Sequence, residues 1–119
     1  METFYYRRLD VYQNAKQLAI RVNDAIKRFP PEERYALADQ LKRASSSVMF
    51  NIAEAFGRFT SNDRQRFLDF SAGSLMETSS ELELAEAYGY ISNEERLAFD
   101  ELILVIVKQL AKLRSAINN

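Results

Sequence analysis

The chain carries few of the side chains that most enzymes use for catalysis. Its 119 residues include no His and no Cys. This excludes a thiolate nucleophile, a His general base, a zinc site with nitrogen or sulfur ligands, a Ser-His-Asp triad and a disulfide. A ferritin-like di-iron site needs Glu-x-x-His and is excluded as well.

Carboxylates are the remaining candidates for acid–base chemistry. Glu77, Glu81, Glu83 and Glu86 lie at helical spacings, and paired carboxylates can act as acid and base. The sequence offers no Gly-rich phosphate loop and no metal-binding His to accompany them. We therefore expect no enzymatic activity, no cofactor and no metal site, and a carboxylate hydrolase is the least favoured alternative.

A second set of polar residues forms a ridge with steps of three and four, which places its members along one edge of a helix. We call this set the polar ridge, and it comprises Gln40, Arg43, Ser47, Asn51, Glu54 and Arg58. One interpretation is a surface that binds a phosphate backbone or another anionic partner. The other is a hydrogen-bonded seam that fixes the register of helices or subunits. Spacing alone favours the seam, because any amphipathic helix has a polar edge.

The elements that must position these residues are four helices, predicted over residues 9–28, 32–56, 62–88 and 93–117. Each carries an apolar stripe with helical spacing. Gly73 lies inside the third helix, where Gly costs about 1 kcal/mol relative to Ala, so we expect a neighbouring helix to approach it closely. The stripes comprise Val11, Ala15, Leu18, Val22, Ala25 and Phe29; Leu37, Leu41, Ala44, Val48, Ile52 and Ala55; Leu68, Ser71, Leu75, Thr78, Leu82 and Ala85; and Phe99, Ile103, Ile106, Leu110, Leu113 and Ile117.

Helix boundaries are indicated by familiar end signals. Pro30 should end the first helix, and residues 60–63 supply good N-cap side chains for the third. Gly57 and Gly89 are candidates for the residue that follows a helix, and Ser92 with Glu95 forms a capping box. Because the connections are short, we predict one all-α domain over residues 1–119, an antiparallel up-down-up-down four-helix bundle.

The fourth helix has more apolar surface than a monomeric bundle needs. Residues 102–107 are apolar on every side, and soluble monomers rarely expose a large apolar patch. We therefore predict a subunit interface that includes Leu102, Leu104 and Val105, although long neighbouring side chains could also cover this face. Six residues cannot span a bilayer, and no targeting segment is evident, so we expect a cytoplasmic protein without membrane contact.

Charge is unevenly distributed along the sequence. Residues 1–66 carry a net charge of +4, residues 67–101 carry −8 and residues 102–119 carry +3. This pattern fits charge complementarity between subunits, a local basic face for nucleic acid, or an ordinary solvated surface. The candidate contacts to RNA or DNA are Arg7, Arg8, Arg43, Arg58, Arg64 and Arg66.

Several motifs in order resemble one family. They include the opening residues 9–15, the stretch 29–37, residues 40–44, residues 51–58 without Phe56, and the third-helix motifs 66–68, 72–77 and 84–91. The chain resembles the small bacterial four-helix bundle proteins that include products encoded in intervening sequences of large-subunit ribosomal RNA. The resemblance implies a bundle that assembles as a ring, typically a homopentamer. One branch, the accessory variability determinants, binds a reverse transcriptase and nucleic acid through a basic outer surface.

Together these features predict a non-enzymatic, ring-forming scaffold or interaction protein. Its first expected partner is another copy of the same chain, and the resemblance implies that the ring is a pentamer. The alternative is a nucleic-acid-binding accessory protein that partners a reverse transcriptase or ribosomal RNA.

Overall fold

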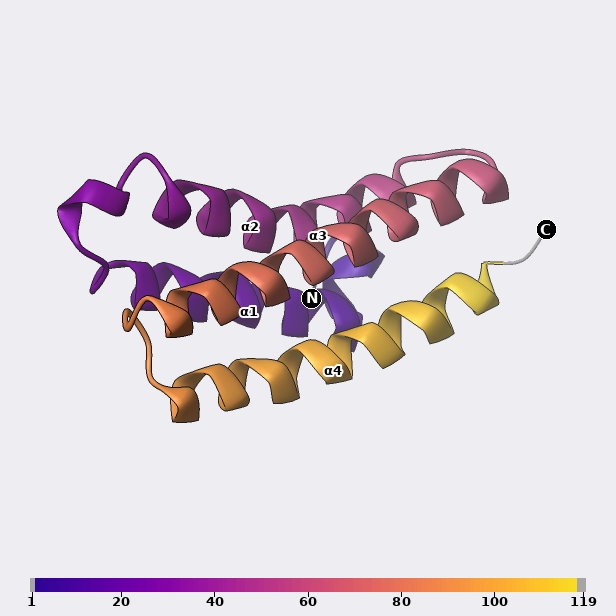
Figure 1. The fold of residues 1–119 in the computed structure, drawn as a ribbon. Helices are drawn as coiled ribbons and strands as arrows, with labels where there is room; N and C mark the ends of the chain where they lie inside the picture. Colours follow the sequence, from indigo (N-terminus) through magenta and orange to yellow (C-terminus); the bar gives the residue numbers. More distant parts are fainter. Residues whose placement is uncertain (1, 118–119) are drawn as a thin grey trace.

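The computed structural model describes residues 2–117, which form four long helices and two short 3-10 turns. Within that range there is no β-strand. In Figure 1 the chain reverses direction at each connection, so neighbouring helices run antiparallel, as predicted. Helices α1 and α3 each pack against α2 and α4, which confirms the all-α four-helix bundle. The elements are η1 (Tyr5–Arg8), α1 (Asp10–Ile26), η2 (Pro31–Glu33), α2 (Leu37–Phe56), α3 (Ser61–Ala87) and α4 (Asn93–Ala116).

The predicted stripes form the core of the bundle. Every stripe residue of the first three helices is buried, and so are Phe99, Ile103, Ile106 and Leu110 of α4. At the end of α4, Leu113 and Ile117 are only half-buried, since little of the bundle extends beyond them. The stripes of α1 and α2 were therefore sufficient to identify their core faces, and only the last turn of α4 departs from the pattern.

Polar side chains within the α3 stripe are satisfied locally. The fully buried Ser71 donates its hydroxyl to the Val48 carbonyl oxygen of α2 at 2.7 Å, and Thr78 donates to the Ser74 carbonyl oxygen at 2.8 Å. Small hydroxyl side chains leave room for two helices to approach, so α2 and α3 make the most extensive helix pair in the bundle. Buried hydroxyls of this kind carry little desolvation penalty because each is hydrogen-bonded.

Three of the predicted helix ends have the expected geometry. The Thr60 hydroxyl accepts from the Asp63 amide at 3.1 Å, and Ser92 and Glu95 form the complete capping box. Gly89 has a φ of +83°, and the amides of Gly89 and Tyr90 donate to the Glu86 and Ala85 carbonyls. This is the Schellman arrangement, in which the left-handed position favours Gly.

Gly57 does not take that role. Its φ is −90° and its ψ is −3°, which is right-handed helical geometry. Gly57 thus follows the last residue of α2, as predicted, but it does so without the left-handed conformation that favours Gly. Its amide donates to the Glu54 carbonyl, as in a final helical turn that any residue could make.

The second helix begins at Leu37, five residues after its predicted start. Ala36 interrupts the helix with φ −122° and ψ −110°, so the residues after Pro30 form only the short turn η2. The Glu33 carboxylate accepts from the Leu37 amide at 3.2 Å and from the Tyr90 hydroxyl at 2.7 Å. The break thus lets one side chain satisfy the start of α2 and tie the α1–α2 connection to the α3–α4 connection.

The expectation for Gly73 was also wrong. Gly73 is exposed on the outer face of α3, and a Cβ atom at this position would meet nothing within 4 Å. Within the described chain no helix approaches it, so the conformational cost of this Gly is not explained by packing inside the bundle.

None of the described helices is long and apolar enough to cross a membrane.

Candidate functional site

The middle of the polar ridge faces α3. The hydroxyls of Ser47 and Ser74 are 2.9 Å apart, and the Asn51 amide donates to the Ser47 hydroxyl and carbonyl oxygens, both at 2.9 Å. Ser47 and Asn51 are half-buried. This geometry is that of a hydrogen-bonded seam between α2 and α3, which is the interpretation that the spacing favoured.

The ends of the ridge form ion pairs within α2 or next to its end. Arg43 pairs with Asp39 at 3.1 Å, and Arg58 pairs with Glu54 at 3.3 Å, each pair being one helical turn apart. Gln40 is exposed and, with Arg43, borders a shallow groove between α2 and α3 with a volume of about 280 Å³. The ridge is therefore divided into a half-buried seam and two ion-paired ends, and it does not form one continuous binding surface.

Two of the candidate carboxylates meet beside this groove. Burial, followed by the hydrogen bond and the negative charge of Glu77, raises the pKa of Glu81 to about 7, while Arg43 acts in the opposite direction. The Oε1 atom of Glu81 is buried and has no hydrogen-bond partner among the described residues. Burial and the neighbouring Glu77 carboxylate therefore favour the protonated form of Glu81, since two adjacent carboxylates resist ionising together.

The other two carboxylates lie elsewhere. Glu83 is exposed, and Glu86 faces α4, where hydrogen bonds from Asn93 and then Arg96 lower the pKa of its carboxyl. The four carboxylates singled out by spacing thus divide among three environments. In residues 2–117 no three His, Cys, Asp or Glu side chains are grouped so that they could hold a metal ion.

The outer face of α3 and α4 is apolar over more of its length than the sequence indicated. Leu104 and Val105 are 53% and 44% exposed, whereas Leu102 is half-buried and packs on the core. Besides Phe70 in the first half of α3, three further large apolar side chains are exposed on these helices. These are Met76, Leu84 and Leu97, at 50%, 41% and 50%.

Two ion pairs fix how these side chains lie across the two helices. Arg114 of α4 pairs with Asp69 of α3 at 2.6 Å near one end of the bundle, and Arg96 pairs with Glu86 near the other. Because α3 and α4 are antiparallel, the two pairs fix which of their residues lie at the same height along the bundle. Leu84 and Leu97 differ in height by no more than about one helical turn, and so do Met76 and Leu104. We call Met76, Leu84, Leu97, Leu104 and Val105 the α3–α4 apolar face. Sequence reasoning missed its α3 members because it followed only the stripe on the opposite, buried side.

Five of the six candidate arginines gather at one end of the bundle. The Tyr6 ring of η1 stacks on Phe56 with centroids 6.3 Å apart, which holds η1 against the end of α2. We call the residues of η1, the end of α2 and the start of α3 the arginine–aromatic end. It includes Phe4, Tyr5, Arg7, Arg8, Arg58, Phe59, Arg64, Arg66, Phe67 and Phe70. Arg43 lies on the middle of α2 beside the polar seam, so the fold does not bring it to this end.

Cations and rings alternate at the arginine–aromatic end. The Arg7 guanidinium lies 4.9 Å from the Phe4 ring centroid, and Arg8 lies 5.2 Å from that of Tyr5. Arg58 lies over Phe67 at 4.2 Å. Tyr5 and Phe4 also border a hollow of about 350 Å³. Such contacts hold guanidinium groups and aromatic faces together at an exposed surface.

Not every arginine there is available to an external anion. Arg7, Arg58 and Arg66 pair with Glu2, Glu54 and Asp63 respectively. Among residues 2–117, Arg8 and Arg64 have no carboxylate within ion-pair distance. Phe59, between α2 and α3, is completely exposed.

In the folded chain, one half of the bundle carries an excess of basic side chains and the other half an excess of acidic ones. The ends of α2 and α4 and the start of α3 lie together at one end in Figure 1. Residues 2–16, 54–70 and 108–117, which make up this half, contain nine basic and five acidic side chains. The remaining residues contain seven basic and twelve acidic side chains. The basic segments at both ends of the sequence are thus neighbours in space.

Comparison with known proteins adds a family to this geometry. A family model described as 23S rRNA-intervening sequence protein matches residues 7–112. A comparison with curated proteins finds no significant match. A crystal structure of a protein of unknown function from the S23 ribosomal protein family of Bacteroides thetaiotaomicron VPI-5482 superposes with a TM-score of 0.80. Its sequence is 24% identical, and the match covers 87% of this chain and 97% of that one, so this likeness concerns the fold. Because the family model spans most of the sequence, the chain belongs to the 23S rRNA-intervening sequence protein family.

Proposed function

We propose that this protein is a non-catalytic cytoplasmic scaffold that assembles with copies of itself through the α3–α4 apolar face. The observation that carries the proposal is the exposure of five large apolar side chains on the adjacent helices α3 and α4. Burying the exposed half of one such side chain contributes about 1 kcal/mol. Several of them on each copy can therefore offset much of the entropy that association costs.

Gly73 supports the same face. It lies between Met76 and Phe70 on the outside of α3, with open space around it. A helix of a second copy could approach α3 closely there, since no side chain stands in the way. The interface would be heterologous if the assembly is a ring, because α3 and α4 of one copy would then meet a different surface of the next. We propose the pentamer that the family resemblance implies.

Self-association is tested by the mass of the purified protein in solution. Light scattering at micromolar concentration should give a multiple of the 13.8 kDa subunit mass. The Leu104→Glu and Val105→Glu variants should lower that mass, because each places a charge in the interface. Phe50→Glu is the matched control, since Phe50 is 62% exposed on α2, away from this face. A mass of one subunit for the wild-type protein would contradict the proposal, as would an unchanged mass for both Leu104→Glu and Val105→Glu.

The arginine–aromatic end favours a second candidate function, binding of RNA or DNA. Exposed rings can stack on bases while arginines contact phosphates, and the fold concentrates both at one end of a chain with a net charge of −1. A reverse transcriptase or ribosomal RNA is the partner that the resemblance suggests for this candidate. Both partners would engage a surface separate from the α3–α4 apolar face.

Fluorescence anisotropy with a labelled single-stranded RNA tests this candidate. Binding should weaken steeply as salt rises, because phosphate contacts release counterions. Replacing both Arg8 and Arg64 by Ala should reduce the affinity, whereas Arg43→Ala should not. Absence of binding at low salt, or an equal loss with Arg43→Ala, would remove the candidate and leave the scaffold proposal untouched.

A further inference from the structure

A groove at the α1–α2 connection is larger than the two grooves already described and belongs to none of the surfaces described above. Its volume is about 500 Å³, which is within the range of small-molecule sites. Its apolar lining comprises the buried Phe29 and Ala38, which form the floor, together with the half-buried Ile26 and the exposed Pro31. Phe29 and Ala38 are buried, so the floor is part of the bundle and does not depend on mobile surface side chains.

Contacts outside the groove hold its floor in place. The ring of Phe29 packs against Tyr90 with centroids 5.1 Å apart. The Tyr90 hydroxyl donates to Glu33, and Glu33 also accepts from the first amide of α2. These contacts hold the segment between α1 and α2 against the segment between α3 and α4. A site whose floor is already fixed loses little conformational entropy when a ligand binds.

The rim of the groove is positively charged. Lys27, Arg34 and Lys42 border it, together with a single acid, Asp39. Asp39 already pairs with Arg43. The pair that Lys27 makes with Asp24 is 3.5 Å long and exposed on both sides, so it holds the ammonium group only weakly. The groove therefore presents three cations around an apolar floor, in a chain whose net charge is −1.

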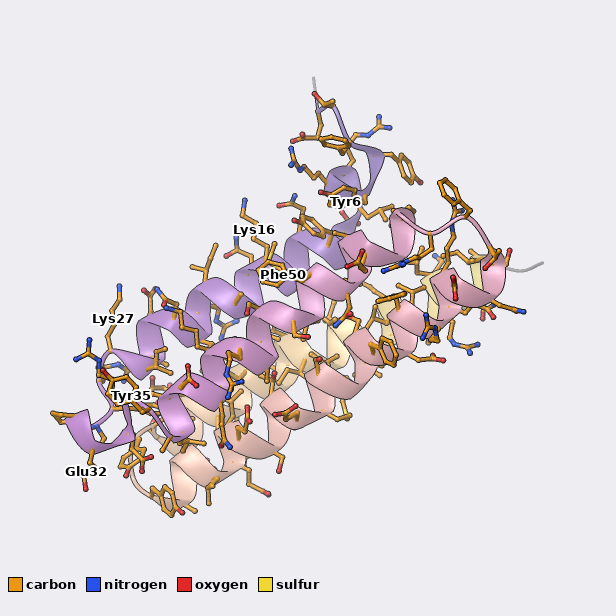
Figure 2. All side chains as sticks on the ribbon, turned by 90° about the horizontal axis from the view of Figure 1, so that it is seen from above. Tyr6, Lys16, Lys27, Glu32, Tyr35 and Phe50 are labelled. Atoms are coloured by element: carbon orange, nitrogen blue, oxygen red, sulfur yellow. The ribbon has the colours of Figure 1, made fainter. Side chains whose placement is uncertain are left out.

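An aromatic ring stands at the edge of the same groove. Tyr35 is 85% exposed, the second-highest value among the large apolar and aromatic side chains, and the Arg34 guanidinium lies 5.4 Å from its ring centroid. In Figure 2 Tyr35 and Lys27 lie at the α1–α2 connection, whereas Lys16 and Phe50 lie toward the middle of α1 and α2. The Tyr35 ring offers one open face beside the cationic rim, which is the arrangement that a planar ring with an anionic group would match.

We propose that the groove at the α1–α2 connection binds a small planar aromatic anion, with the ring between Tyr35 and the apolar floor and the anionic group against Lys27, Arg34 and Lys42. Apolar contact and charge act together in this arrangement. An inorganic anion would use only the rim, and a neutral ring would use only the floor and Tyr35. The ligand class is therefore an aryl or heteroaryl phosphate or sulfonate, which includes nucleoside monophosphates.

The proposal is tested with two probes and the full-length protein. Anilinonaphthalene sulfonate, followed by its fluorescence, and adenosine monophosphate, followed by calorimetry, distinguish a sulfonate from a phosphate source of the anionic group. Saturable binding of either probe with one site per chain is the expected result. Inorganic phosphate should compete at least tenfold less effectively than the aromatic probes. Equal competition by inorganic phosphate would overturn the proposed role of the ring, and no saturable binding of either probe would overturn the site.

Matched variants locate the binding. Lys42→Ala and Tyr35→Ala should each weaken binding by roughly threefold to tenfold, since each removes one charged or aromatic contact. Their controls are Lys16→Ala and Phe50→Ala, which remove the same kinds of exposed side chain from outside the groove. Equal weakening by the controls would overturn the assignment. Leu104→Glu should leave the affinity unchanged, which separates this site from dye bound to the α3–α4 apolar face.

Discussion

Glu81 makes the stability of the bundle depend on pH. Burial against α2 and the neighbouring Glu77 raise the pKa of Glu81 from 4.5 to about 7. Because the pKa is higher in the folded chain than in the unfolded chain, the folded state binds the proton more tightly. The stabilising contribution of this proton is therefore fully present below about pH 4.5 and is lost as the pH rises through about 7.

The size of this effect follows from the pKa difference and from exposure. A shift of this kind corresponds to about 3 kcal/mol for a fully buried group, since one pKa unit is about 1.4 kcal/mol. Glu81 is only half-buried, and solvent screening reduces the expected value to about 1 kcal/mol. In Glu81→Gln a neutral amide replaces the carboxyl at every pH. This variant should therefore be more stable than wild type by about 1 kcal/mol at pH 8 and equally stable near pH 4.5.

Urea denaturation followed by circular dichroism at both pH values measures the difference. Thermal melts should show the same effect as a rise in Tm of about 3–6 °C at pH 8. Glu83→Gln is the matched control, because Glu83 lies on the same helix but is exposed. A stability difference that is the same at both pH values would refute the reasoning, and so would a control that behaves like Glu81→Gln.

Further predictions concern the helix ends and Gly73; differential scanning calorimetry measures the changes in stability, and light scattering measures the change in self-association. Ser92→Ala removes the capping hydroxyl of α4 and should destabilise the fold by about 1 kcal/mol. An unchanged Tm would contradict the role of the cap. The hydrogen bond from Arg28, followed by that from the Ser92 backbone, lowers the pKa of Glu95 to about 2. The stability that Glu95 contributes should thus be present above about pH 4.5 and disappear toward pH 2, whereas Glu95→Gln should lack this dependence. Gly89→Ala forces a side chain to φ +83° and should cost about 1–2 kcal/mol; a neutral result would show that this turn can relax. Gly73→Ala should stabilise the isolated chain by up to about 1 kcal/mol, because a Cβ there meets nothing, while weakening self-association if a second copy approaches α3 at this point.

The core could be predicted from the sequence because it depends on a single local property, the helical spacing of apolar residues. That spacing identified Leu18, Val48, Leu75 and Ile106 as core positions, and each is fully buried. The capping box at Ser92 was equally readable, since all of its atoms come from four consecutive residues. Local chemistry of this kind needs no knowledge of the rest of the chain.

Features that depend on distant residues could not be predicted in the same way. The start of α2 at Leu37 depends on Glu33, whose other partner, Tyr90, lies 57 residues further along the chain. The outer face of α3 was overlooked because Met76 and Leu84 become part of a larger apolar surface only when α4 packs beside α3. The arginine–aromatic end likewise exists because the Tyr6 ring reaches Phe56. In each case tertiary packing, and not local propensity, decides which residues share a surface.

The solution mass of the wild-type protein, measured beside that of Leu104→Glu, tests whether copies of the chain associate through the α3–α4 apolar face. Wild-type protein at micromolar concentration should have a mass several times 13.8 kDa, five times if the proposed pentamer is right. The variant should fall toward one subunit while keeping its helical circular dichroism. A wild-type mass of one subunit, or a folded variant with the wild-type mass, would contradict association through this face.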